Sequence, residues 1–121
     1  MGDFSGMLYE EMFSKHGNIF LKFYEGHPII TKNGIETFDN VKKRVLDMIG
    51  HCSRVHSNEN ILLVTHMDPI KSLISTVLKS SPESLYELII RNASLTILKK
   101  EQSSLSLIAI NSMCSERYPQ E

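Results

Sequence analysis

Five histidines are the side chains of this 121-residue sequence with the clearest capacity for acid–base or phosphoryl chemistry, and His66 has the most informative setting. It follows four consecutive apolar residues, 61–64, which are too few for a helix but typical of a strand covered on both faces. Asp68 and Pro69 then predict the N-cap and the first position of a helix. His66 would therefore lie at the carboxyl end of a strand and beside a helix N-terminus, where open α/β sheets bind anions.

This predicted setting allows two interpretations of His66. A histidinium and the amides of a helix terminus can jointly hold a phosphoryl oxygen. Alternatively, the imidazole only hydrogen-bonds a turn, and spacing alone leaves both interpretations open. The sequence fixes no second acid–base partner, because capping of the helix adequately explains Asp68.

The other four histidines have settings that favour structural roles. His51 and His56 fall late in a predicted helix, and His27 falls in a predicted loop. His16 stands between Lys15 and Gly17, which superficially resembles a catalytic Arg-His-Gly triplet. However, it follows a predicted helix and not an apolar strand, so we do not assign it as a nucleophile.

The remaining sequence predicts the elements of one α/β domain over residues 1–121. Apolar periodicity and capping residues predict helices over 7–15, 36–55, 69–79 and 81–87. Short apolar runs and alternation predict strands over 61–64, 88–91, 94–99 and 104–110, the last two as a hairpin. Residues 17–35 show no sustained period and are predicted to be a loop anchored by apolar side chains. The tail from Asn111 is predicted to be loose.

Composition narrows the classes of protein that fit. The hydrophobic content of 41% suits one core, and a net charge of −1 argues against binding to nucleic acid or a membrane surface through bulk charge. Cys52 and Cys114 have no paired spacing, which argues against a disulfide framework or a zinc site. No signal-peptide pattern and no run of membrane-spanning length occur, so we expect a soluble, cytoplasmic protein.

Several short stretches carry a further signal through their shared order over nearly the whole sequence. They are residues 2–6, 34–37 with Arg44, 61–70, 92–96 and 108–111. In this order they resemble the histidine phosphatase superfamily, the phosphoglycerate mutase-like proteins. Residues 61–70 are similar to the motif around that family's second histidine, and residues 34–37 are similar to its Gly-Glu-Ser stretch.

The resemblance implies a two-step phosphoryl transfer through a phosphohistidine, with no metal and no cofactor. In that scheme the first histidine, in an Arg-His-Gly motif, is the nucleophile, and an upstream acid protonates the leaving group. Two arginines and the second histidine hold the phosphoryl oxygens. Only the second histidine maps onto this sequence, at His66, with Thr65 and Met67 on either side of it. We therefore expect His66, Thr65 and Met67 to contact phosphate or a phosphorylated small molecule.

The sequence also departs from the family, because no part of it matches the nucleophile strand, the two phosphate arginines or the usual acid. We expect a partial phosphoglycerate mutase-like three-layer sandwich: a mixed sheet flanked by helices, with the first central strand missing. The missing strand would leave the strand at residues 61–64 unpaired on one side. Self-association through that sheet edge, or rearrangement of residues 17–35, is therefore expected.

Three functional hypotheses remain open at this point. The chain is a truncated histidine phosphatase that is inactive alone, because a covalent mechanism without its nucleophile loses essentially all turnover. Alternatively, it is a non-catalytic module that binds a phosphate ligand or has a regulatory role. The third hypothesis is a subunit whose site is completed by another chain.

Overall fold

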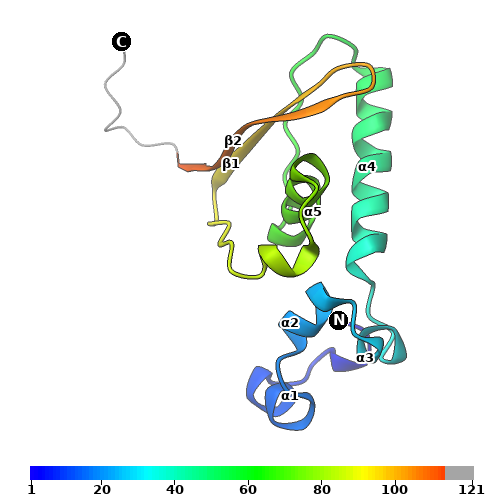
Figure 1. Cartoon of the computed structure of the whole chain (residues 1–121), viewed down its shortest axis with the longest axis vertical. Helices are drawn as coiled ribbons and strands as arrows, with labels where there is room; N and C mark the ends of the chain where they lie inside the picture. The colour runs from blue at the N-terminus through cyan, green and yellow to red at the C-terminus, as the bar shows by residue number, and fades with distance from the viewer. Residues whose placement is uncertain (114–121) are drawn as a thin grey trace.

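The computed structural model describes residues 1–113, which run from a group of short helices to two longer helices and a hairpin (Figure 1). The helices are α1 (Tyr9–His16), α2 (Ile19–Glu25), α3 (Pro28–Lys32), α4 (Phe38–Val55) and α5 (Met67–Leu78), with 3₁₀ turns at Gly2–Phe4 and Pro82–Leu85. The strands β1 (Ser94–Lys100) and β2 (Leu105–Met113) form an antiparallel pair. Helix α5 contacts both α4 and β2, so it joins the helical and the strand parts of this region.

The longest helix, α4, confirms the helix expected over residues 36–55. The hydroxyl of Thr37 accepts a hydrogen bond from the Asn40 amide at 3.2 Å and caps the helix start. Phe38 and Val41 in the first turn are buried, whereas Met48 and other apolar residues further along are exposed. The amphipathic pattern therefore indicated the helix correctly, although residues 1–113 cover only part of its apolar stripe.

The loop expected over residues 17–35 was wrong, because this stretch contains α2 and α3. The side-chain oxygen of Asn18 accepts from the Leu21 amide at 3.0 Å and caps α2, which ends at Gly26 in the left-handed conformation. Nδ1 of His27 accepts from the Ile29 amide and caps α3. Helices of seven and five residues are too short to establish a visible period. Their capping residues therefore resembled loop signals.

With Asp68 as its N-cap, helix α5 would begin at Pro69. It begins two residues earlier, at Met67. His66 is its N-cap, and the Asp68 carboxylate instead accepts a hydrogen bond from the Tyr24 hydroxyl. The helix ends at Lys79, which adopts the left-handed conformation with φ 51° and confirms the expected stop. The short helix expected over 81–87 appears as a 3₁₀ turn, Pro82–Leu85.

The expected hairpin is confirmed, whereas the strands expected at residues 61–64 and 88–91 are wrong. Neither segment has a strand partner among residues 1–113, and a β-strand requires one for its ladder of hydrogen bonds. The side chains of Ile61, Leu62, Leu63 and Val64 are 42%, 77%, 45% and 94% exposed, so this segment is not covered on both faces. The described part of the chain thus has a two-stranded antiparallel sheet, and not the mixed sheet of a three-layer sandwich that we expected.

The tail expected to be loose from Asn111 is wrong in its first three residues, which belong to β2. The rest of that expectation, together with Cys114, lies outside the described residues. Within residues 1–113, no helix is long and apolar enough to cross a membrane.

Two clusters of buried apolar side chains hold these elements together. One comprises Phe4, Met12, Ile19 and Ile30, and the other comprises Tyr24, Phe38, Ile74, Leu85 and Ile90. Phe23 of α2 packs against both clusters, so α2 connects the short N-terminal helices to α4 and α5. The described residues form a mixed helix and strand fold with α2 and α5 at its centre.

The turn at Gly2–Phe4 shows why glycine stands at its first position. Gly2 has φ 53°, and a Cβ there would lie 2.2 Å from the carbonyl oxygen of Asn33. The adjacent Asp3 amide donates to the same carbonyl at 2.9 Å. Only glycine allows this close backbone approach, which seats Phe4 in its cluster.

Candidate functional site

His66 lies at the N-terminus of α5, as expected, although it caps the helix with its backbone alone. Its carbonyl accepts from the Ile70 amide at 3.4 Å, and its exposed imidazole makes no capping hydrogen bond. Because Pro69 has no amide hydrogen, the amides of Met67 and Asp68 are the ones in this first turn that have no partner among residues 1–113. The imidazole and two amides are thus available to a ligand at this end of the helix.

His66 lines an open hollow of about 300 Å³ between the start of α4, α2, α3 and the start of α5. Its polar lining comes from His66, Arg44, Glu36 and Asp68. Its apolar lining comes mainly from Ile19, Phe20, Phe23, Ile30, Ile35 and Val41. A ligand in this hollow would meet both charged and apolar side chains.

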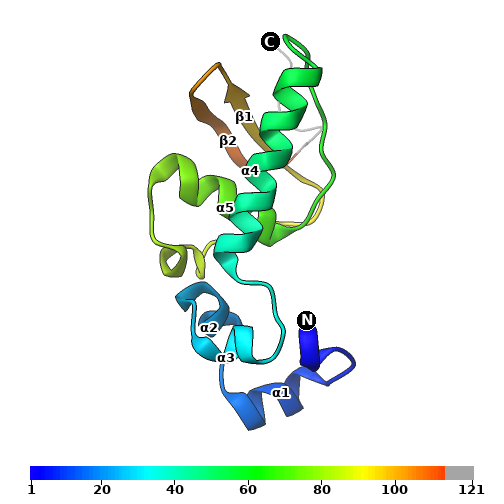
Figure 2. The ribbon, with the colours of Figure 1, turned by 90° about the vertical axis from the view of Figure 1, so that its right-hand side faces the viewer.

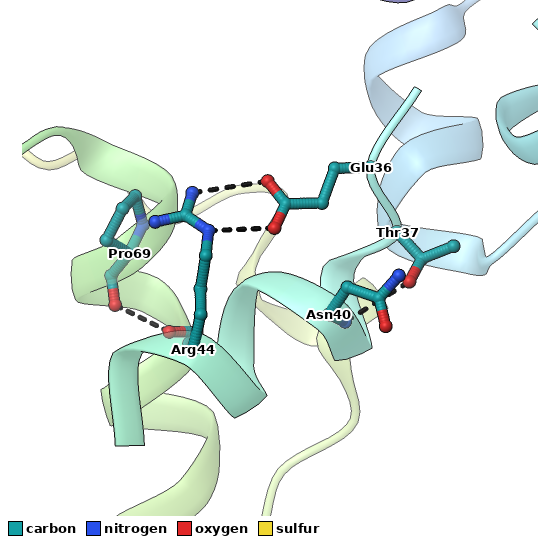
Figure 3. A network of polar contacts seen from close by, with 6 residues as sticks. Glu36, Thr37, Asn40, Arg44 and Pro69 are labelled. Carbon is teal, nitrogen blue, oxygen red and sulfur yellow. Dashed lines mark hydrogen bonds and ion pairs between the residues drawn. The ribbon is translucent and has the colours of Figure 1, made fainter. Parts of the chain in front are cut away.

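Arg44 and Glu36 form a two-pronged ion pair at the edge of the hollow. Nε and Nη2 of Arg44 donate to Oε1 and Oε2 of Glu36 at 2.7 and 3.2 Å, and the guanidinium lies between Glu36 and Pro69 (Figure 3). The hydrogen bond to Glu36 raises the pKa of Arg44 above its ordinary value. The pair largely cancels its own charge, so Arg44 presents little net attraction to an anion.

A second polar contact anchors the first turn of α5 to α2. The Tyr24 hydroxyl donates to Oδ1 of Asp68 at 2.5 Å, and the almost completely buried Lys71 places its ammonium 5.0 Å from the centre of the Tyr24 ring. Burial lowers the pKa of Lys71, although the charges of Asp68 and Glu87 oppose that shift. Burial, and then the hydrogen bond to Asp68, raises the pKa of Tyr24, so its hydroxyl remains a donor. This contact fixes the turn that carries His66.

The structure brings together only part of the expected site. Thr65 and Met67 flank His66 in sequence, but both are exposed and neither lines the hollow, so their contact with a ligand stays a prediction. Sequence reasoning missed Tyr24 and Lys71 as supports of the α5 N-terminus. It noted the separation of Glu36 and Arg44 but did not predict their ion pair. The available signal was the capping residue Thr37, because it sets the start of the helix that carries Arg44 directly after Glu36.

Two of the other histidines make local contacts. The ring of His16 lies 4.9 Å from the ring of Phe4, at the end of α1. Nδ1 of His56 lies 3.4 Å from the carboxylate of Glu59, and both side chains are half exposed. Residues 1–113 contain no group of three or more His, Cys, Asp or Glu side chains placed to hold a metal ion.

Comparison with known proteins gives matches along most of the chain. "Putative phosphoserine phosphatase 2" and "Phosphoserine phosphatase 1" of Hydrogenobacter thermophilus are each 24% identical, over 96% and 93% of this chain. A "2,3-bisphosphoglycerate-dependent phosphoglycerate mutase" of Thermoplasma acidophilum is 36% identical over 65% of this chain. The matched regions make up 57%, 54% and 37% of those proteins, so the chain spans about half the length of the two phosphatases.

No solved structure gives a significant match. The sequence pattern of the histidine phosphatase superfamily (branch 1) matches residues 1–113, which is nearly the whole chain. This match spans all the short stretches between residues 2 and 111 on which the resemblance rested. The chain therefore belongs to the histidine phosphatase superfamily, branch 1.

Proposed function

We propose that this chain binds the phosphate group of a small phosphorylated molecule at His66 and does not turn it over by itself. The observation that carries the proposal is the exposed imidazole of His66, which makes no cap bond and lines the hollow at the N-terminus of α5. Membership of the superfamily supports a phosphate ligand, because the resemblance assigns the second histidine to the phosphoryl oxygens.

The charges around the hollow make weak binding the expected outcome. Arg44 is already paired with Glu36, and Asp68 presents a carboxylate to the same space. An anion would therefore gain hydrogen bonds from His66 and from the Met67 and Asp68 amides against partly unfavourable charge. We expect a dissociation constant on the order of 1 mM, because a few exposed hydrogen bonds give about 4 kcal/mol.

The absence of turnover is proposed from the residues that the covalent scheme needs. The 121 residues contain no Arg-His-Gly motif, and the nearest equivalent, Lys15-His16-Gly17, ends a helix with its ring against Phe4. His66 holds oxygens in the family scheme and does not attack phosphorus. A bound phosphomonoester would thus lack the attacking group.

A test combines activity and binding on the purified chain. Phosphoserine, 3-phosphoglycerate and p-nitrophenyl phosphate serve as substrates, and calorimetry measures binding of inorganic phosphate. The matched pair is His66→Ala and His51→Ala, since His51 is exposed on α4. We expect no turnover, and phosphate binding that falls about tenfold in His66→Ala and not in His51→Ala. Turnover lost in His66→Ala would show that the chain itself is catalytic, and equal binding by both variants would place the phosphate site elsewhere.

A second candidate is a subunit whose site is completed by another polypeptide chain. The exposed residues 61–64 favour it, because this apolar segment directly precedes His66 and has no strand partner among residues 1–113. A gain of phosphatase activity on mixing with a second, separately purified chain would support this candidate.

A further inference from the structure

The link between α4 and α5 contains an apolar segment without a partner. The backbone groups of residues 60–65 make no hydrogen bond within residues 1–113 and belong to no helix or strand there. Four large apolar side chains, residues 61–64, are exposed there. Figure 2 shows this link along the outer edge of the molecule, to the right of α4. Unpaired strand groups and exposed apolar side chains together favour pairing with another strand.

We propose that this segment pairs antiparallel with the same segment of a second copy of the chain, with Leu62 of each copy opposite Leu63 of the other. This register also places Ile61 opposite Val64 and Asn60 opposite Thr65. At its ends, Glu59 of each copy lies opposite His66 of the other. In this register apolar residues lie opposite apolar residues, polar residues lie opposite polar residues, and the acid lies opposite the base.

Charge selects this arrangement over its alternatives. Parallel in-register pairing would place Glu59 beside Glu59 and His66 beside His66, which repels when the side chains are charged. Shifting the antiparallel register by one residue separates Glu59 from His66 and places a polar residue opposite an apolar one. In the single chain, Glu59 lies 3.4 Å from Nδ1 of His56 with both side chains half exposed. That contact is weak enough for His66 of a second copy to replace it.

The short pairing implies a weak, reversible dimer. A strand of about six residues buries well under the roughly 800 Å² per partner of a stable interface. The dimer should therefore form at tens to hundreds of micromolar, and single substitutions should change it measurably.

The pairing also regulates the His66 site, a consequence that rests on the proposed function. A carboxylate of Glu59 against the imidazole occupies the group that would otherwise contact a phosphoryl oxygen. Phosphate and the second copy then compete for His66, so phosphate favours the single chain.

Analytical ultracentrifugation across 10–500 µM of the full chain tests the pairing (concentrations chosen around the expected affinity). Leu62→Lys should weaken the dimer about tenfold or more, because it buries a charge in the apolar pairing. Leu8→Lys is the matched control, since Leu8 is 72% exposed and precedes α1 at the opposite end of the molecule, against 77% for Leu62. Equal dimerisation of both variants, or a wild-type chain that is monomeric throughout, would overturn the proposal.

Exchanging the charges tests the register separately from nonspecific apolar association. Glu59→Lys should weaken the dimer, and Glu59→Lys combined with His66→Glu should restore it, because the opposite charges again face each other. A double variant as weak as Glu59→Lys would refute this register.

Adding inorganic phosphate to the wild-type chain should shift it toward monomer. A dimer unmoved at phosphate concentrations that bind would refute the competition, whereas failure of phosphate to bind would refute the proposed function and leave the variant results standing.

Discussion

Replacing Lys71 with methionine should stabilise the protein, because the side chain of Lys71 is almost fully buried and makes no hydrogen bond or ion pair among residues 1–113. Lys71 is only 1% exposed, and its pKa is lowered by burial despite the attraction of Asp68 and Glu87. A lowered lysine pKa means that the fold disfavours the charged form. Met keeps an unbranched side chain, one heavy atom shorter than that of lysine, and removes the charge.

The magnitude follows from opposing contributions. Removing a poorly paired ammonium at the end of a largely buried side chain relieves a cost of several kcal/mol, whereas losing its position over the Tyr24 ring forfeits about 1–2 kcal/mol. We expect a net gain of about 1–2 kcal/mol at pH 7, which corresponds to a Tm higher by roughly 4–10 °C for a small domain. Lys43→Met, on the exposed face of α4, is the control and should change stability by less than about 0.5 kcal/mol.

The stability difference between Lys71→Met and the wild-type chain should depend on pH. Well below the lowered pKa, both folded and unfolded chains hold the Lys71 proton, and the cost of burying it is fully present. As pH rises between that pKa and the ordinary value of 10.5, the folded chain releases the proton first, so the unfolded chain binds more protons. The Lys71 contribution to stability therefore improves with rising pH, and the advantage of Lys71→Met shrinks.

Urea unfolding of both proteins from pH 7 toward pH 9.5 measures this difference. Titrating groups far from residue 71 are common to both proteins, so their contributions to the pH dependence cancel to first order. A Lys71→Met protein that is less stable at pH 7, or a difference that does not shrink with pH, would refute the reasoning. It would show that the buried ammonium is well satisfied in the fold.

Three further substitutions probe the anchoring of α5, the N-terminal turn and the ion pair at the hollow. Tyr24→Phe removes the hydroxyl that donates to Asp68 and should cost about 1–2 kcal/mol in urea unfolding; an unchanged midpoint would contradict this anchor. Gly2→Ala should cost about 1–2 kcal/mol, and more than Gly6→Ala, because only the first would push a Cβ into a carbonyl; equal losses would count against that close approach. Glu36→Gln weakens the ion pair that occupies Arg44 and should tighten phosphate binding about two- to fivefold in calorimetry, whereas weaker binding would show that the pair itself supports the site.

The elements that could be predicted from sequence are those whose signal is local. Helix α4 shows its apolar spacing over 18 residues, and the hairpin shows alternation in both strands. Helices α2 and α3 were missed because their stability comes from packing of Phe23 and Ile30 and not from a long period. The strand at residues 61–64 was wrong because four apolar residues describe a strand only when another strand pairs with them.

The candidate site divides in the same way. The place of His66 at the start of a helix was visible from Pro69 and the apolar positions that follow it. The hydrogen bond from Tyr24 to Asp68 joins residues 44 positions apart, and no local sequence pattern predicts it. Lys71 lies on the helical face that packs against Tyr24, so its burial depends on tertiary structure alone.

The most direct test of phosphate binding at His66 is an NMR titration of the ¹⁵N-labelled chain with inorganic phosphate. The account predicts saturable shifts centred on the amides of Met67 and Asp68 and on the His66 ring, with none of comparable size at His16 or His51. It also predicts that His66→Ala moves the titration midpoint at the two amides to about tenfold higher phosphate. Phosphate-dependent shifts elsewhere, with the amides at the start of α5 unmoved, would contradict it.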